Sequence, residues 1–459
     1  MAGIGFELRK IFGKKTLLSH TYGILYASVV SIGPSLVFIA LLFAIRFLLQ
    51  YYFVTELEKL FFTSSFTYAF LVAILESAFF NTVLSRYISD KVFEGNESDI
   101  CASMFGTLTV GSVISGVIAL ILCCRMYFHN NVPMGFLVAY YLLIILASNV
   151  YNMITYISAL KEYLKVTLSY LVGTAIALVL VLVFYHVFYM HLIMACYWAL
   201  VAGFFVINLM LVYTCIKMFG LPSNRYFTFL TYLKKYPQLL ISGCAYMWGF
   251  YIANLIYWNF SNMSVQVSIF KTAPNYDMAL FGALLVNLSG MVLFEVKTET
   301  TFYERYIEYL SAIKKGTYDL IESKRVDLQN TISLQLFLLY KVQLIITIIL
   351  ICLANIFYPY LGFSSQILNM FLLLGMGVFC IICMYSTVIF LYYFEDHWSS
   401  AISMGVFFGI VLIGACICCV IGEPYYPIPV LLGGIIGWIT SFIMLRKRLK
   451  NLNAYLLCK

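Results

Sequence analysis

The chain has 459 residues, of which 63% are apolar or aromatic and only 10% are charged. Soluble domains are about 45–50% apolar and about 25% charged, so the composition and the mean hydropathy of +0.95 exclude an ordinary soluble enzyme. The net charge of +8 does not indicate nucleic-acid binding. The basic residues lie in short segments between apolar runs, where they set membrane topology.

Long apolar runs follow one another along the chain. Each holds roughly 20 or more residues, enough to cross a hydrocarbon core of about 30 Å as a helix. The pattern predicts an all-α polytopic membrane protein with twelve transmembrane helices. Their predicted ranges are 22–49, 60–88, 102–124, 134–158, 166–188, 192–216, 239–258, 278–296, 332–356, 367–393, 400–421 and 428–445.

The basic residues predict the orientation of these helices, because Lys and Arg are enriched in cytoplasmic loops. With a cytoplasmic N-terminus, most of the 28 Lys and Arg residues fall in cytoplasmic segments. Arg46, Lys59, Arg125 and Lys271 fall outside, and Lys341 lies within a span. This bias predicts an even number of spans, with both termini in the cytoplasm.

A basic loop divides the predicted spans into two sets of six. Two six-helix lobes around a central cavity are typical of transporters. The predicted organisation is an amphipathic cytoplasmic segment at 1–21, an N-lobe at 22–216, an inter-lobe loop at 217–238, a C-lobe at 239–445 and a basic cytoplasmic tail at 446–459.

The longest cytoplasmic segment predicted within the C-lobe is 297–331. Aromatic and apolar residues recur there at helical spacing and charged residues fill the other face, which predicts an amphipathic helix with an exposed aromatic stripe. Such a helix either lies on the membrane or docks a partner. The docking interpretation places Tyr306, Tyr309, Lys314 and Lys315 at the contact.

Two ionisable residues fall deep inside predicted spans, where a charge is costly and commonly marks function. Glu76 lies in the second span and Lys341 in the ninth, at similar depth, with opposite charge and in opposite lobes. They are candidates for a gate or a coupling site that faces the space between the lobes. The alternative is a structural ion pair, or a Lys that extends to the interface.

Further polar residues near the ends of spans are candidates for the cavity lining. The residues at the inner ends of spans either line the inner mouth of the cavity or anchor the membrane interface. The residues at the outer ends make the outer end of the cavity polar, as a water-filled cavity requires. The inner candidates are Arg86 and Glu295, and the outer candidates are Lys271, Asp277, Asn254 and Trp258. Gly33 and Pro34 kink the first span and are a candidate hinge, although a static kink is an equal alternative.

Several segments carry a family resemblance. The opening string of residues 1–10, Met-Ala-Gly-Ile-Gly-Phe-Glu-Leu-Arg-Lys, is the most distinctive, together with Glu-Thr-Thr-Phe-Tyr at 299–303. Arg-Tyr-Ile-Ser-Asp at 86–90 and Asn-Leu-Ile-Tyr-Trp at 254–258 follow the same order. The chain resembles the PelG family, the polytopic inner-membrane subunits of Pel exopolysaccharide machineries, which is similar to polysaccharide transporters of the MOP flippase superfamily.

The resemblance implies a function in polysaccharide export across the cytoplasmic membrane. The expected cargo is a growing, cationic, partly deacetylated polymer rich in N-acetylgalactosamine. The expected partners are a PelF-like cytoplasmic glycosyltransferase, membrane lipids and accessory Pel membrane subunits. The resemblance carries over no catalytic residue, and we expect no metal and no cofactor.

Two other functions compete with polysaccharide export. A flippase for lipid-linked oligosaccharides shares the fold but would need a basic cavity for the pyrophosphate, for which only Lys341 and Arg46 are candidates. A membrane-embedded glycosyltransferase or polymerase is less favoured, because the predicted outer loops are short and no catalytic motif is present. We therefore do not expect an enzyme.

The predicted topology can be tested with single cysteines introduced at positions 130, 310 and 362. An impermeant thiol reagent added to intact cells should label positions 130 and 362, which lie in predicted outer loops. Position 310 should remain unlabelled, because it lies in the cytoplasmic segment. Labelling of position 310 from outside would refute this topology.

Overall fold

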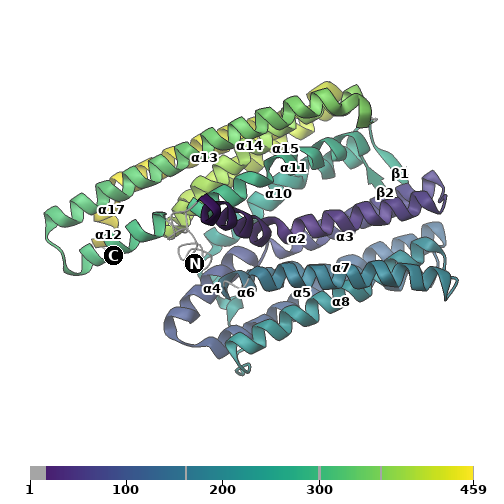
Figure 1. The fold of residues 1–459 in the computed structure, drawn as a ribbon, viewed down its shortest axis with the longest axis horizontal. Coiled ribbons are helices and arrows are strands. Elements are labelled where there is room, and N and C mark those ends of the chain that lie inside the picture. Colours follow the sequence, from purple (N-terminus) through teal and green to yellow (C-terminus); the bar gives the residue numbers. More distant parts are fainter. Residues whose placement is uncertain (1–16, 161–162, 298–300, 362–363, 458–459) are drawn as a thin grey trace. The chain divides into compact units, whose positions relative to one another are not determined.

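The structure of the protein, a computed structural model, describes residues 17–160, 163–297, 301–361 and 364–457 (Figure 1). Most of the predicted N-terminal segment, 1–21, therefore lies outside the described residues. The described elements are helices apart from one two-stranded antiparallel hairpin. They form two compact units.

The first unit consists mainly of Ile32–Met247, together with the short segment Val265–Thr272. Its central helix, labelled α6 in Figure 1, packs against five others, α3, α4, α5, α7 and α8. The elements are part of α2 (Leu17–Tyr51), α3 (Glu56–Ser77), α4 (Asn81–Glu94), α5 (Glu97–Asn130), α6 (Met134–Leu160), α7 (Tyr163–His186), α8 (Leu192–Phe219), α9 (Phe229–Lys235), the beginning of α10 (Pro237–Phe260), β1 (Val265–Val267) and β2 (Phe270–Thr272).

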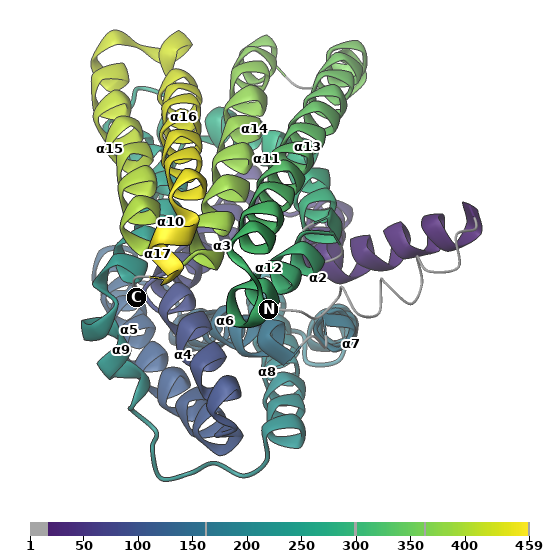
Figure 2. The same cartoon turned by 90° about the vertical axis from the view of Figure 1, so that its left-hand side faces the viewer.

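The second unit consists mainly of Trp248–Ser264 and Ala273–Lys459. Figure 2 shows three of its helices, α14, α15 and α16, side by side, and α16 packs against both of the others. The elements are the rest of α10, α11 (Pro274–Lys297), α12 (Tyr303–Lys315), α13 (Tyr318–Leu361), α14 (Ser365–Tyr393), α15 (His397–Ile421), a short 3-10 helix (Glu423–Tyr425), α16 (Ile428–Lys450) and α17 (Leu452–Leu457).

Eleven helices in the part of the chain that the structure describes are long and apolar enough to cross a membrane. The protein is therefore a multi-pass membrane protein. The eighth predicted span, 278–296, falls within α11, which is not among the eleven. The count of twelve spans and the location of the termini stay predictions.

The second predicted span, 60–88, is wrong as a single helix. Helix α3 begins at a capping box, in which Thr55 and Glu58 bond to each other's backbone N–H. It ends at Ser77, where two i→i+3 bonds, Phe79 N to Glu76 O and Phe80 N to Ser77 O, form a turn before α4. The chain stays apolar through this turn, so hydropathy alone does not reveal the break.

Tyrosine hydroxyl groups are paired in the core where α3, α6 and α8 meet. Tyr140 Oη donates to the backbone oxygen of Ser65 at 3.1 Å, and Ser65 Oγ lies 2.5 Å from Tyr197 Oη. All three residues are buried. Hydrocarbon offers no hydrogen-bond partner, so such pairs let polar groups lie at membrane depth.

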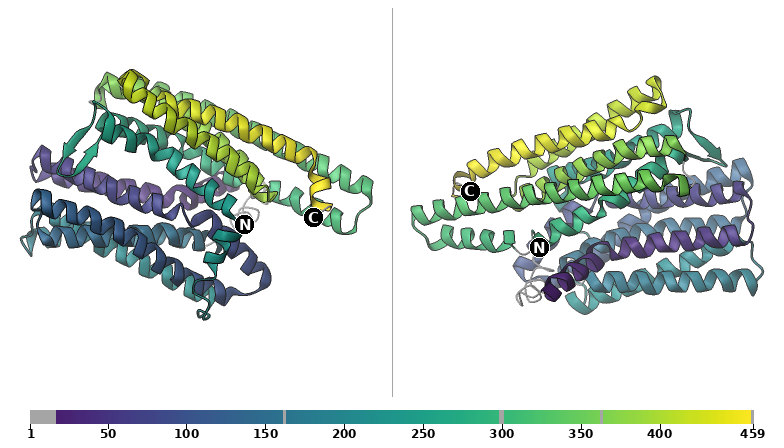
Figure 3. Two further views of the ribbon diagram at one scale, coloured as in Figure 1. Left: turned by 180° about the vertical axis from the view of Figure 1, so that it is seen from behind. Right: turned by 45° about the horizontal axis from the view of Figure 1, so that its top comes forward.

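The connection from α10 to α11 contains the β-hairpin, which belongs to the first unit (arrows in Figure 3). Phe270 of β2 is 0% exposed and packs against the rings of Phe61, Tyr68 and Tyr140. Tyr68 Oη donates to the backbone oxygen of Lys271 at 2.8 Å. The sequence predicted only a loop here; the hairpin is instead anchored to α3.

A buried network of amides and hydroxyls joins three helices of the second unit. Asn287 Oδ1 accepts hydrogen bonds from Gln343 Nε2 at 3.1 Å and Thr347 Oγ1 at 3.0 Å, and its amide nitrogen donates to the backbone oxygen of Gly375. Ser289 Oγ donates to Gln343 Oε1 at 3.0 Å. The network links α11, α13 and α14.

The predicted cytoplasmic segment, 297–331, contains two helices. Helix α12 ends at Lys315, Gly316 follows, and α13 begins at Tyr318 and runs for 44 residues. At about 1.5 Å per residue, α13 is about 66 Å long, more than twice a hydrocarbon core of about 30 Å. Its first part therefore extends beyond the membrane, and α12 packs against it (Figure 1). The prediction of one continuous helix is wrong, because Gly316 interrupts it.

Replacing Phe270 with Ala should destabilise the first unit. Truncating a fully buried Phe costs about 3–5 kcal/mol, through lost burial and the cavity left behind. Heating followed by size-exclusion chromatography of the purified protein should show a lower melting temperature. Val265→Ala is the control, because Val265 lies in the same hairpin but is 42% exposed. Equal melting temperatures for the two variants would contradict the anchoring role of Phe270.

Candidate functional site

Glu76 lies where three helices of the first unit meet. It is on α3, is 2% exposed, and accepts hydrogen bonds from Asn152 Nδ2 on α6 at 3.1 and 3.4 Å. A Cβ at Gly111 on α5 would lie 2.8 Å from Asn152 Nδ2 and 2.9 Å from Glu76 Oε1. The absence of a side chain at Gly111 therefore leaves room for the pair.

Lys341, the other charge predicted within a span, is exposed on α13. It belongs to the second unit, whereas Glu76 belongs to the first. The structure thus shows a buried carboxyl group and an exposed ammonium group. The hypothesis that both face one cavity stays a prediction.

Three of the predicted outer residues come together in the second unit. Asp277 Oδ1 accepts hydrogen bonds from Asn254 Nδ2 at 2.7 Å and from Trp258 Nε1 at 3.0 Å. Its second oxygen, Oδ2, accepts from the backbone N–H of Ala273 at 3.2 Å. The cluster joins α10 to the first turn of α11, and these bonds hold its side chains in place.

The other candidates are dispersed. Arg86 forms an ion pair with Asp90 at 3.1 Å on α4, and its guanidinium lies 5.5 Å from the ring centre of Tyr236. Lys271 is held in β2 by its backbone. The side chain of Glu295 lies outside the described residues. Arg86 and Lys271 therefore have structural contacts, and their role in a cavity stays a prediction.

Helix α2 continues through the predicted hinge, Gly33 and Pro34, without interruption. Gly33 is buried, and a Cβ there would lie 2.8 Å from the methyl carbon of Thr167 on α7. The boundary between the units falls next to this point, at Ser31 and Ile32. A hinge function for Gly33 and Pro34 stays a prediction.

Two adjoining cavities lie along the side of α5 in the first unit. Both contain Phe105 and Thr109, and their volumes are about 640 and 330 Å³. The larger cavity lies between α5 and α6 and combines three hydroxyl groups and two aromatic rings with aliphatic side chains. Its lining is Phe105, Leu108, Thr109, Ser112, Val113, Gly116, Val117, Leu120, Tyr141 and Ile145.

The predicted inter-lobe loop forms one wall of the smaller cavity. Its walls include Pro222, Tyr226 and Phe227. The backbone oxygen of Tyr226 would clash with a Cβ at Gly106, so the loop rests directly on α5 at a glycine. Any larger residue at position 106 would force the loop away.

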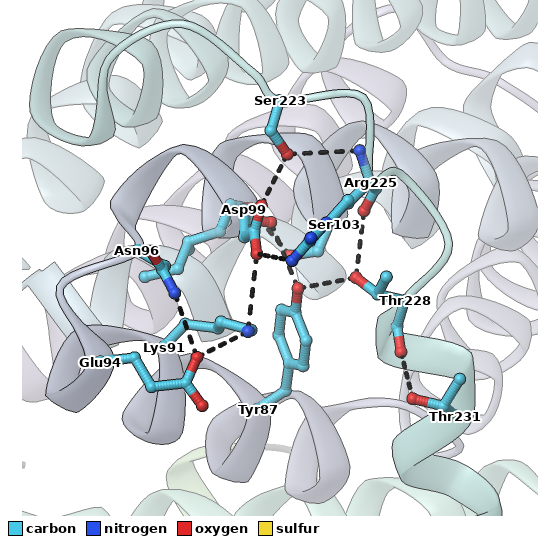
Figure 4. A network of polar contacts seen from close by, with 11 residues as sticks. Tyr87, Lys91, Glu94, Asn96, Asp99, Ser103, Ser223, Arg225, Thr228 and Thr231 are labelled. Atoms are coloured by element: carbon cyan, nitrogen blue, oxygen red, sulfur yellow. Dashed lines mark hydrogen bonds and ion pairs between the residues drawn. The ribbon is translucent and has the colours of Figure 1, made fainter.

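A polar clasp centred on Asp99 holds this loop to the first unit (Figure 4). Asp99 is buried at the start of α5 and accepts a hydrogen bond from Ser223 Oγ at 2.7 Å. Lys91 Nζ and Arg225 Nη1 each lie 3.5 Å from its Oδ2 atom. Nearby, Tyr87 Oη lies 2.9 Å from Thr228 Oγ1. These groups come from α4, α5 and the loop.

The charges of the clasp stabilise one another. Glu94 accepts from Lys91 Nζ at 2.7 Å, and this bond raises the pKa of Lys91. The same bond lowers the pKa of Glu94. Lys91 therefore stays protonated between two carboxylates, and its positive charge reduces the cost of burying Asp99.

The sequence matches a family model over residues 1–456. The description of that family is "PelG: Putative exopolysaccharide Exporter (EPS-E)". The chain belongs to the PelG family. The resemblance seen in its opening string and later segments is thus confirmed over nearly the whole length. No curated protein matches the sequence.

Solved structures show which fold this PelG-family chain adopts. It is similar to an outward-facing multidrug resistance MATE family transporter of the MOP superfamily, with a TM-score of 0.65, 12% identity, and coverage of 94% of this chain and 96% of that chain. A MOP superfamily transporter from Pyrococcus furiosus gives a TM-score of 0.63 at 12% identity and the same coverage. The predicted MOP flippase-like fold class is confirmed.

The expected aromatic docking stripe on α12 is largely internal, which corrects the sequence-based prediction. Tyr309 is 0% exposed, its hydroxyl lies 2.7 Å from Asn453 Oδ1 on α17, and burial raises its pKa to about 12. Tyr306 is half-buried and stacks on Phe302. Periodicity identified the apolar face correctly, but the chain's own α14 and α17 cover it. Lys314 and Lys315 are exposed.

Sequence reasoning missed Asn152 and Asp99. Asn152 is an amide in an otherwise apolar run, which is itself a signal, because amides at membrane depth need partners. Asp99 lies close in sequence to several other charges, and nothing in the chain order shows that a loop more than a hundred residues later returns to it. Only the fold reveals that contact.

Replacing Asp99 with Asn should release the loop. Hydrogen bonds to charged groups contribute about 1.5–3 kcal/mol each. A loss of about 1.4 kcal/mol changes the equilibrium constant between the bound and the released loop ten-fold. Trypsin should therefore cut the purified protein after Arg225 at least about ten-fold faster. Glu97→Gln is the control, because Glu97 is exposed two residues away. Unchanged cleavage in Asp99→Asn would show that the clasp does not restrain the loop.

Proposed function

We propose that this protein exports a Pel-type exopolysaccharide across the cytoplasmic membrane and receives the growing chain from a PelF-like cytoplasmic glycosyltransferase. Membership of the exopolysaccharide exporter family over residues 1–456 is the observation that carries the proposal. The MOP transporter fold, found over 94% of the chain, supports it independently. Both the family and the structural neighbours are transporters.

The cavities along α5 support a carbohydrate cargo. Sugar rings present both hydroxyl groups and apolar C–H faces, so a surface that holds them needs hydrogen-bonding groups beside aromatic rings. Phe105 and Tyr141 provide rings, and Thr109 and Ser112 provide hydroxyl groups. Tyr226 and Phe227 continue the aromatic lining into the smaller cavity. We propose that this surface contacts the polymer.

We propose that the glycosyltransferase docks on the solvent-exposed face of α12 and the beginning of α13. A specific interface needs about 800 Å² from each partner. Lys314 and Lys315 are exposed at the end of α12, and Ile307 and Tyr318 are 42% and 71% exposed. This combination of apolar and basic side chains suits a protein partner with an acidic rim. Tyr309 supports the surface from beneath.

Inverted membrane vesicles can test export directly. Vesicles that contain this protein and the glycosyltransferase should, when given nucleotide sugars, accumulate polymer that an added glycoside hydrolase cannot reach. Vesicles without this protein should leave the polymer accessible. Protection of a lipid-linked oligosaccharide instead of polymer would favour the flippase alternative, and protection of neither would refute the proposal.

Charge reversal of Lys314 and Lys315 to Glu should reduce co-purification of the glycosyltransferase. The physical reason is repulsion from the acidic rim of the partner. The matched control is charge reversal of Lys234 and Lys235, an exposed pair in the last turn of α9. Each double variant places two negative charges at the C-terminal end of a helix, where the helix dipole disfavours them to a similar extent. The two variants therefore differ only in where the charges lie on the protein. Wild-type recovery with the Lys314 and Lys315 variant would refute docking at α12.

A further inference from the structure

The carboxyl group of Glu76 has no cation beside it among the described residues. Its partner is Asn152 Nδ2, and α6 contains no Asp, Glu, Lys or Arg. On α5, Asp99 and Arg125 lie 12 and 14 residues from Gly111, so they are roughly 20 Å away along the helix. A carboxylate at this position would be buried with one amide donor.

The other titratable groups on the surrounding elements bond to other residues or lie far from Glu76. Glu58 and Lys59 lie at the opposite end of α3, and Lys271 of the hairpin contacts α3 at Tyr68, eight residues from Glu76. Tyr156 of α6 bonds to Thr107, with 2.9 Å between the oxygens. None of the bonds described for these groups reaches Glu76.

The amide oxygen of Asn152 completes the pattern. Asn152 is fully buried, and its Oδ1 atom has no hydrogen-bond partner in the part of the chain described. A carboxylate only accepts hydrogen bonds, so it leaves Oδ1 unsatisfied. A protonated carboxyl group donates its O–H to Oδ1 and accepts from Nδ2, which satisfies both side chains. The arrangement therefore suits a carboxyl group that carries a proton.

Polar side chains lead away from the pair in two directions. On one side, Asn149 of α6 and Ser112 of α5 bond to each other at 3.0 Å, and Ser112 lines the larger cavity. On the other side, Thr155 Oγ1 donates to Asn81 Oδ1 at 2.9 Å. Asn81 lies in the first turn of α4, directly after the turn that ends α3. Asn149 and Thr155 lie three residues before and after Asn152, so polar groups continue along this face of α6 on both sides of the pair.

We propose that Glu76 and Asn152 form a proton-binding site that couples polymer export to proton entry. The proposal rests on the proposed function and adds its energy source. A proton from the outer side converts the Glu76 carboxylate to the acid, and the acid later releases the same proton to the cytoplasm, so each cycle moves one proton inward. Asn152 is the positioning residue, and Gly111 provides the space for the pair.

Infrared spectroscopy of the purified full-length protein in lipid nanodiscs tests the site without any export assay. A difference spectrum between acidic and alkaline pH should contain the C=O band of a protonated carboxyl group. Glu76→Gln should remove this band, whereas Asp277→Asn, a matched change at another hydrogen-bonded carboxylate, should retain it. Asn152→Ala should shift the band to higher frequency, because the O–H group loses its acceptor. A band that persists unchanged in Glu76→Gln would overturn the proposal.

Vesicle export tests the coupling. An ionophore that dissipates only the pH gradient should stop the accumulation of protected polymer by the wild-type protein. Glu76→Gln should also lose export, at normal protein level and with normal glycosyltransferase recovery. Wild-type export that is unaffected by loss of the pH gradient would overturn the coupling and leave the proposed function intact. Loss of wild-type export under every condition would instead refute the proposed function.

Discussion

The absence of hydrogen-bond partners in hydrocarbon is the constraint on which the rest of this structure depends. Every polar group at membrane depth must be satisfied by the protein itself. The network of Asn287, Gln343 and Thr347 meets this requirement, because each of its side chains bonds to another. The pair of Glu76 and Asn152 meets it only when a proton is present. This difference separates a structural network from a candidate site.

The sequence predicts the membrane class and most of the spans, because both follow from the average hydropathy of long segments. It also identifies Glu76, and it brings attention to Asn254, Trp258 and Asp277, which the structure joins. It does not reveal the partner of Glu76. That partner depends on which faces of α3 and α6 meet, and an almost uniformly apolar helix carries little information about its faces.

The predicted cytoplasmic segment, 297–331, shows the same limit in another form. The spacing of Phe302, Tyr306 and Tyr309 indicates the apolar face of α12 correctly, but an apolar face can be covered by lipid, by a partner or by the same chain. Here Tyr309 bonds to Asn453 and Phe302 packs on Phe390. The covering helices are distant in sequence, so no local pattern predicts the contact. The loop held by Asp99 is a second example.

The β-hairpin has a mechanical consequence. The hairpin belongs to the first unit, whereas the residues directly before and after it, up to Ser264 and from Ala273, belong to the second. The chain passes between the units through single peptide links at these points, and one residue spans at most about 3.5 Å. No linker residues separate the hairpin from the segments before and after it. While the hairpin stays anchored to α3 through Tyr68, Ser264 and Ala273 can each lie no farther from it than one residue's length.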